Sequence, residues 1–95
     1  MKHGILMHEP DDDVGVAVED LRAGTEIGAV TLEGKPVHAV TLVTDVPLGH
    51  KVAMRDIACG KDVIEYGRVI AVAFKDAPRG SHVHTHCIKT KRWTA

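Results

Sequence analysis

The chain has 95 residues, enough for one small domain with a core but with little room for a deep substrate cleft of its own. Twelve Lys and Arg residues against thirteen Asp and Glu residues give a net charge of −1, which argues against nucleic acid or anionic lipid as a partner. Neither a signal peptide nor an apolar run of about 20 residues, as a membrane helix needs, is visible. We therefore expect a cytoplasmic protein that works with a protein partner.

The predicted elements are short strands separated by long turns. In chain order, runs rich in β-branched and apolar residues predict strands at residues 14–18, 29–32, 37–43, 63–66 and 69–74. A competing helix over residues 54–58 is too short and too poorly capped to be favoured. The predicted fold class is therefore all-β.

One eight-residue phrase occurs four times along the chain. It reads Asp, three residues, Gly, two residues and then Val or Ile, at residues 20–27, 45–52, 56–63 and 76–83. Glycine at the fifth position suits a turn with a positive φ, and aspartate at the first position can bond nearby backbone amides. The starts lie 25, 11 and 20 residues apart by subtraction, so a turn is repeated without the fixed period of a solenoid.

Two polar segments carry further candidate residues. In HEPDDD, near the start of the chain, residues 11–13 are interpreted as an acidic surface loop, whereas His8 and Glu9 stay candidates for a functional site. In the second phrase, GHK places the imidazole of His50 beside the amine of Lys51, at a turn from which side chains can reach a cleft. An exposed turn without a function is the open alternative for this segment.

The stretch HVHTHC, at residues 82–87, places three histidines at alternate positions. In an extended strand these three side chains point the same way over about 13 Å, at about 3.3 Å per residue. Metal–imidazole bonds measure only about 2.0 to 2.1 Å, so two neighbours can share an ion but all three cannot without a bend. The pattern favours a His-x-His pair with a further ligand from a partner, from substrate, or from His8, His38 or His50. A solvated strand face, or one imidazole in a buried hydrogen-bond network, is the alternative.

The cysteines and the chain end indicate a compartment and a contact surface. Cys59 and Cys87 have no metal-ligand spacing and are interpreted as free thiols in a reducing cytosol. Residues 88–95 form a basic C-terminal tail that carries the single tryptophan, Trp93. Chain ends are often poorly ordered, but Trp and Arg often anchor interfaces, and we favour a docking tail.

Three segments together resemble a known family. His8 with VGVAV, the segment DVPLGHKVAMRDIACGKDVIEYG at residues 45–67, and RGSHVHTH at residues 79–86 are similar to the SAF domain of the altronate and galactarate dehydratase family. The resemblance implies a β-clip fold of folded-over hairpins, with residues 1–95 as a single SAF domain. The ending KTKRW is more similar to the sulfolactate sulfo-lyase branch than to the sugar-acid branch. Cys87 stands where relatives most often have Asn, which puts in doubt the hydrogen bond that an Asn would make there.

The resemblance implies the small subunit of a two-subunit lyase. The implied reaction is β-elimination of water or sulfite from a 2-hydroxy carboxylate such as altronate or (2R)-sulfolactate, with Fe²⁺ as the implied cofactor. A large catalytic subunit would supply most of the cleft, and a homo-oligomer is open. The residues expected to act in catalysis are His84, His86, His50 and Lys51. The expected metal ligands are His82, His84, His86 and His8.

Two other classes of function remain open at this point. In the first, the chain is a free-standing module that binds sugar acids. In the second, it is a structural module, since SAF domains also occur in proteins without this chemistry. A fold alone does not settle function.

Overall fold

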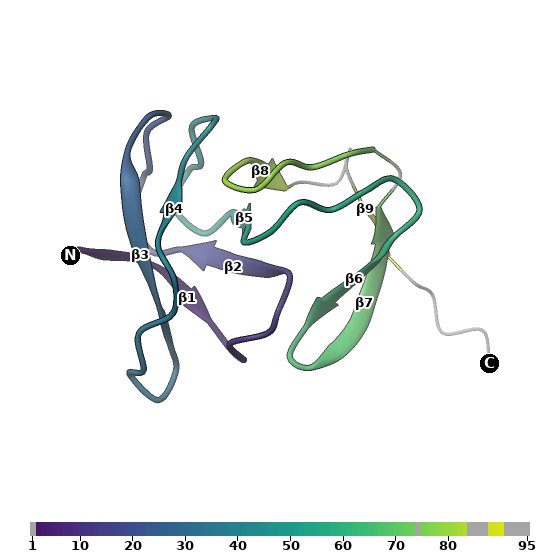
Figure 1. Ribbon diagram of the computed structural model, residues 1–95, viewed down its shortest axis with the longest axis horizontal. Helices are drawn as coiled ribbons and strands as arrows, with labels where there is room; N and C mark the ends of the chain where they lie inside the picture. Colours follow the sequence, from purple (N-terminus) through teal and green to yellow (C-terminus); the bar gives the residue numbers. More distant parts are fainter. Residues whose placement is uncertain (1, 74, 84–87, 91–95) are drawn as a thin grey trace.

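The computed structural model describes residues 2–73, 75–83 and 88–90 (Figure 1). Within these ranges every regular element is a β-strand, which confirms the all-β prediction, and the helix weighed for residues 54–58 is absent. No helix in this part of the chain is long and apolar enough to cross a membrane. The strands are β1 (His3–Met7), β2 (Val14–Ala17), β3 (Glu26–Thr31), β4 (Val40–Thr41), β5 (Lys51–Ala53), β6 (Asp62–Glu65), β7 (Arg68–Ala73), β8 (His82–Val83) and β9 (Ile88–Thr90).

The strands form two sheets. The larger sheet has six strands in the order β4-β3-β1-β2-β5-β8, and the smaller has three in the order β6-β7-β9. Strands β1 and β3 run parallel, and the other strand pairs are antiparallel. Figure 1 shows β3 and β4 at one end of the molecule and the β6–β7 hairpin towards the other, with β5 and β8 between them.

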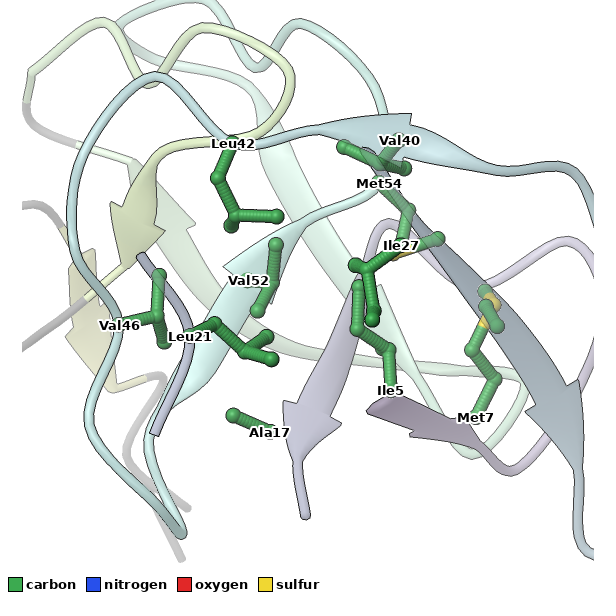
Figure 2. Packing of buried hydrophobic residues seen from close by; sticks show 11 residues of the cluster. Ile5, Met7, Ala17, Leu21, Ile27, Val40, Leu42, Val46, Val52 and Met54 are labelled. Atoms are coloured by element: carbon green, nitrogen blue, oxygen red, sulfur yellow. The ribbon is translucent and has the colours of Figure 1, made fainter. Parts of the chain in front are cut away.

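Each side of β5 contributes to a different hydrophobic core. Because side chains alternate along a strand, Val52 points to one face and Ala53 to the other. Val52 belongs to the first core, which Figure 2 shows packed between the strands of the larger sheet. The first core consists of Ile5, Met7, Ala17, Leu21, Ile27, Ala29, Val40, Leu42, Val46, Val52 and Met54. The second core consists of Val14, Ala53, Ile57, Val63, Ala71, Ala73, Ala77 and Val83.

The four repeated phrases join in two pairs. The glycine at the fifth position has a positive φ in all four, at Gly24, Gly49, Gly60 and Gly80, as predicted. Phrases one and two form the first turn pair, in which Leu21 and Val46 exchange backbone hydrogen bonds of 2.8 and 2.9 Å. Phrases three and four form the second turn pair, in which Ile57 and Ala77 do the same at 2.8 Å each.

The aspartate of each phrase bonds its partner phrase and not its own turn. In the first turn pair Leu48 N–H donates to Asp20 Oδ1 and Ala23 N–H donates to Asp45 Oδ1, both at 2.9 Å. The second turn pair repeats this exchange through the carboxylates of Asp56 and Asp76, at 2.8 Å each. The prediction of a local bond was therefore wrong, because the amides lie 17 to 28 residues away in the chain.

Candidate functional site

The described histidine of the HVHTHC stretch lies against His50. Strand β8 pairs with β5 so that His82 stands opposite Val52. His50 Nδ1 and His82 Nε2 are 2.9 Å apart, and the ring centroids are separated by 4.9 Å. His8, His38 and His50 were considered as further ligands beside the histidine stretch. Of these, His50 contacts His82. His84 and His86 lie outside the described residues.

A preceding loop of the chain holds His82 in place. The Thr44 Oγ1 atom accepts the backbone N–H of His82 at 2.9 Å. In the turn before it, the Arg79 guanidinium donates to the carbonyl oxygen of Ala39 at 2.6 Å. The position of His82 is therefore set by residues about 40 positions earlier in the chain, which sequence patterns did not reveal.

The His50–His82 contact is a hydrogen bond between the two rings, and the same two nitrogens are ligand atoms of a kind and spacing that a divalent ion accepts. Two ligand atoms at a right angle around an ion, each with a bond of about 2.1 Å, lie about 3.0 Å apart, close to the 2.9 Å between these nitrogens. Imidazole suits iron, zinc, copper and nickel alike. Within the described ranges, however, no three or more His, Cys, Asp or Glu side chains lie close enough together to hold one metal ion. The pair thus offers two donors and leaves further ligands to be supplied from elsewhere.

Lys51 lies on the other face of β5, in an ion pair that the sequence did not predict. Its Nζ atom is 2.7 Å from Glu65 Oε1, and the two side chains are 32% and 3% exposed. Since Lys51 alternates with Val52, and His82 is the cross-strand partner of Val52, the ion pair and the histidine pair are on opposite faces of the ribbon. The residues expected to act together therefore occupy at least two places.

Glu65 is the functional candidate that sequence reasoning missed. Its Oε2 atom is buried and, among the described residues, has no hydrogen-bond partner. A signal was available, because Glu65 follows Val63 by two positions and so belongs to the buried side of β6. A buried carboxylate there needs a cation, and Lys51 supplies it.

Replacing Lys51 with methionine is expected to lower the free energy of unfolding by about 2 kcal/mol, because the Glu65 carboxylate stays buried without its cation. The double variant Lys51→Met with Glu65→Leu should recover most of that loss, since it removes the charge as well. Urea unfolding of the chain and its variants measures both. Equal losses of stability in the single and double variants would show that the loss does not come from the unpaired Glu65 carboxylate.

The acidic segment near the start of the chain is mostly buried, which corrects its interpretation as a surface loop. Asp11 is exposed, but Asp12 and Asp13 are only 1% and 3% exposed. Asp13 accepts the backbone N–H of Ile64 at 2.8 Å and an ammonium hydrogen bond from Lys61 at 3.1 Å. Because the β6–β7 hairpin presents amides and a cation to these carboxylates, the acidic segment fastens the smaller sheet to the larger one.

The other two candidate histidines have separate partners. The His8 ring is 3.8 Å from the ring of Tyr66, measured between centroids. His38 Nε2 lies 3.2 Å from the carbonyl oxygen of Met54, to which it donates a hydrogen bond. His8 and His82 are the two predicted metal ligands that the structure describes. Neither belongs to a set of three described side chains that could hold a metal ion.

Two surface hollows of the described chain contain none of the predicted site residues. They lie at the two turn pairs and measure about 230 and 440 Å³. The first is lined by Asp20, Leu21, Arg22, Asp45, Val46 and Pro47, and the second by Asp56, Ile57, Ala58, Asp76, Ala77 and Pro78. Neither hollow is lined by a histidine or a lysine, so neither offers a group of this kind to move a proton.

Comparison with known proteins gives consistent matches. The family model described as the altronate/galactarate dehydratase SAF domain matches residues 3–91. The chain is 35% identical over 94 residues to the (2R)-sulfolactate sulfo-lyase subunit alpha of Chromohalobacter salexigens, which covers 98% of this chain and 100% of that protein. It is 48% identical over 54 residues to the subunit alpha from Paracoccus pantotrophus, covering 57% of this chain and 81% of that one. It is 44% identical over 79 residues to the altronate dehydratase of Escherichia coli, covering 83% of this chain but only 15% of that enzyme.

Proposed function

Because the chain belongs to the altronate/galactarate dehydratase SAF domain family, we propose that it is the small subunit of a two-subunit lyase. The observation that carries the proposal is coverage. This chain covers the whole of a sulfo-lyase subunit alpha but only 15% of a dehydratase. A protein named subunit alpha has at least one other subunit, and the match leaves 85% of the dehydratase chain uncovered. The proposed partner is accordingly a large catalytic subunit.

The proposed reaction is β-elimination from a 2-hydroxy carboxylate such as (2R)-sulfolactate or altronate. A base removes the proton from the carbon next to the carboxylate, and the electron pair of that C–H bond forms the new double bond. The neighbouring carbon loses sulfite, or loses hydroxide that an acid protonates to water. The step therefore needs a base, positive charge near the carboxylate and, for water loss, an acid.

The chain offers groups suited to each of these tasks. Imidazoles exchange protons near neutral pH, which makes the His50–His82 pair suited to acid and base work, together with His84 and His86 of the same stretch. The Lys51 ammonium supplies positive charge, and Glu65 holds it in place. Fe²⁺, when bound, would stabilise charge on the substrate carboxylate, and we assign its protein ligands to His82, His84, His86 and His8, with His50 beside them.

Three observations support a cleft that is completed by the partner. The candidate residues lie on at least two faces, neither hollow at the turn pairs is lined by them, and the described side chains do not complete a metal site. We place the assembly in the cytoplasm, a location with which the exposed free thiol of Cys59 agrees.

Mixing the chain with the large subunit is expected to produce an elimination activity that neither has alone. The expectation follows because each component holds only part of the site. Release of sulfite from sulfolactate, and of the 2-keto acid from altronate, measures the activity and identifies the substrate. Full activity of the large subunit alone would reduce this chain to a structural role.

A further inference from the structure

The turn between β6 and β7 contains a residue in an unfavourable backbone conformation. Glu65 pairs with Arg68, so that Tyr66 and Gly67 form a two-residue hairpin loop. Their φ angles are +61° and +71°, and two positive φ values in such a loop indicate a type I′ turn. This turn favours Asn-Gly or Gly-Gly, whereas a bulky residue with positive φ costs stability. Within the described ranges Tyr66 is the only residue other than glycine with a positive φ.

A buried carboxylate holds this turn. Asp12, which is 1% exposed, accepts the backbone N–H groups of Tyr66 and Gly67 at 2.9 and 3.1 Å. The same carboxylate accepts the N–H of Glu9 at 3.2 Å. One side chain therefore fixes the hairpin turn and the backbone directly after His8.

The result of this arrangement is a pair of tilted rings in contact at the surface. Tyr66 is 53% exposed, and the centroid of its ring lies 3.8 Å from that of the His8 ring, at an angle of 40° between the ring planes. A strained residue that persists within a well-held structure points to a function, since relaxed alternatives are available to the chain. Asparagine in this position would satisfy the turn but would leave His8 without its neighbour.

We propose that Tyr66 is a positioning residue for His8 in the lyase reaction. The tyrosine ring restricts the His8 imidazole to one orientation at the surface, and Asp12 keeps the tyrosine in place. The inference rests on the proposed function and names a residue that acts through His8 and not on the substrate. The phenolic hydroxyl is not required for this role, because the contact is between the two rings.

The test compares Tyr66→Asn with Tyr66→Phe in the chain assembled with its large subunit. Tyr66→Asn keeps a residue that tolerates positive φ, so its urea unfolding midpoint should equal or exceed that of the wild type. Its kcat/KM should fall at least about tenfold through kcat, because binding of substrate elsewhere in the cleft is unchanged. Tyr66→Phe keeps the ring and should retain most of the activity. A variant that is at least as stable yet less active separates positioning from a purely structural role.

A second measurement does not depend on turnover. In NMR spectra of the full chain, the ring protons of His8 should shift when Tyr66→Asn removes the neighbouring ring, and should stay near their wild-type positions in Tyr66→Phe. Unshifted His8 resonances in Tyr66→Asn, or a kcat/KM within twofold of the wild type, would overturn the proposal. If the assembled wild-type protein eliminates nothing from either acid, the proposed function fails, whereas shifted His8 resonances would still establish the ring contact.

Discussion

Replacing Gly80 with alanine is expected to lower the free energy of unfolding by about 4 kcal/mol. Gly80 has a φ of +85°, a conformation that costs an alanine about 1 to 2 kcal/mol. In addition, a Cβ atom there would overlap the carbonyl oxygen of Thr41, which is backbone and has no side-chain freedom with which to move away. The overlap adds the cost of forcing the turn away from that strand, about 1 to 3 kcal/mol. Urea or thermal unfolding of the purified chain measures the loss.

The chain contains a matched control for this substitution. Gly60 occupies the same place in the third phrase and has a φ of +87°, and a Cβ atom added to it would meet nothing within 4 Å. Gly60→Ala should therefore show the conformational cost alone, about 1 to 2 kcal/mol. Similar losses in the two variants would mean that the close approach of Gly80 to Thr41 contributes nothing to stability.

Replacing His84 and His86 together with alanine is expected to lower the turnover of the assembled enzyme by about 100-fold or more. His84 comes one residue after β8 and His86 three residues after it in the sequence, and both lie outside the described residues. His82→Ala alone should cost less, because it leaves His84 and His86, two neighbouring histidines of the alternating set that can share one ion. If the two histidines act as ligands or proton carriers, the fold should be kept, since a histidine that faces a cleft would contribute little to the core.

Turnover and metal content of the complex measure this effect, with the exposed His3 as the control position. His3→Ala should behave as the wild type in both measurements. Near-normal turnover and metal content in the double variant would make the histidine stretch a solvated strand face and would place the site wholly on the large subunit.

Local patterns predicted the turns of this protein better than its strands. The four glycines were identified because a positive φ is a local demand that one residue satisfies. Strand β1 was missed because its sequence, HGILM, includes a glycine and forms a strand only through pairing with both β2 and β3. Strand β5 has three residues, too few for a pattern, and the strand expected at residues 37–43 is reduced to Val40–Thr41.

The candidate site shows the same limit. His50 was named beside the histidine stretch because residue type suggested it, but its contact with His82 depends on the pairing of β5 with β8. The expectation that Asp12 is solvated was wrong because two of the amides that it binds lie 54 and 55 positions later in the chain. Charge and composition carry no information about such distant partners, so burial of this carboxylate was not predictable from a local pattern.

The exchange of aspartate bonds between distant phrases also has a consequence for how the protein assembles itself during synthesis. The aspartates of the two turn pairs are 25 and 20 residues apart by subtraction, so their loop-closure entropies differ by only about 0.2 kcal/mol. With so small a difference, the order in which the ribosome releases the chain decides which pair closes first. The first is complete once residue 52 has emerged, whereas Gly80, whose carbonyl oxygen accepts the N–H of Val43, emerges 28 residues later. The contacts that bring His82 into place therefore form only after the first turn pair has closed.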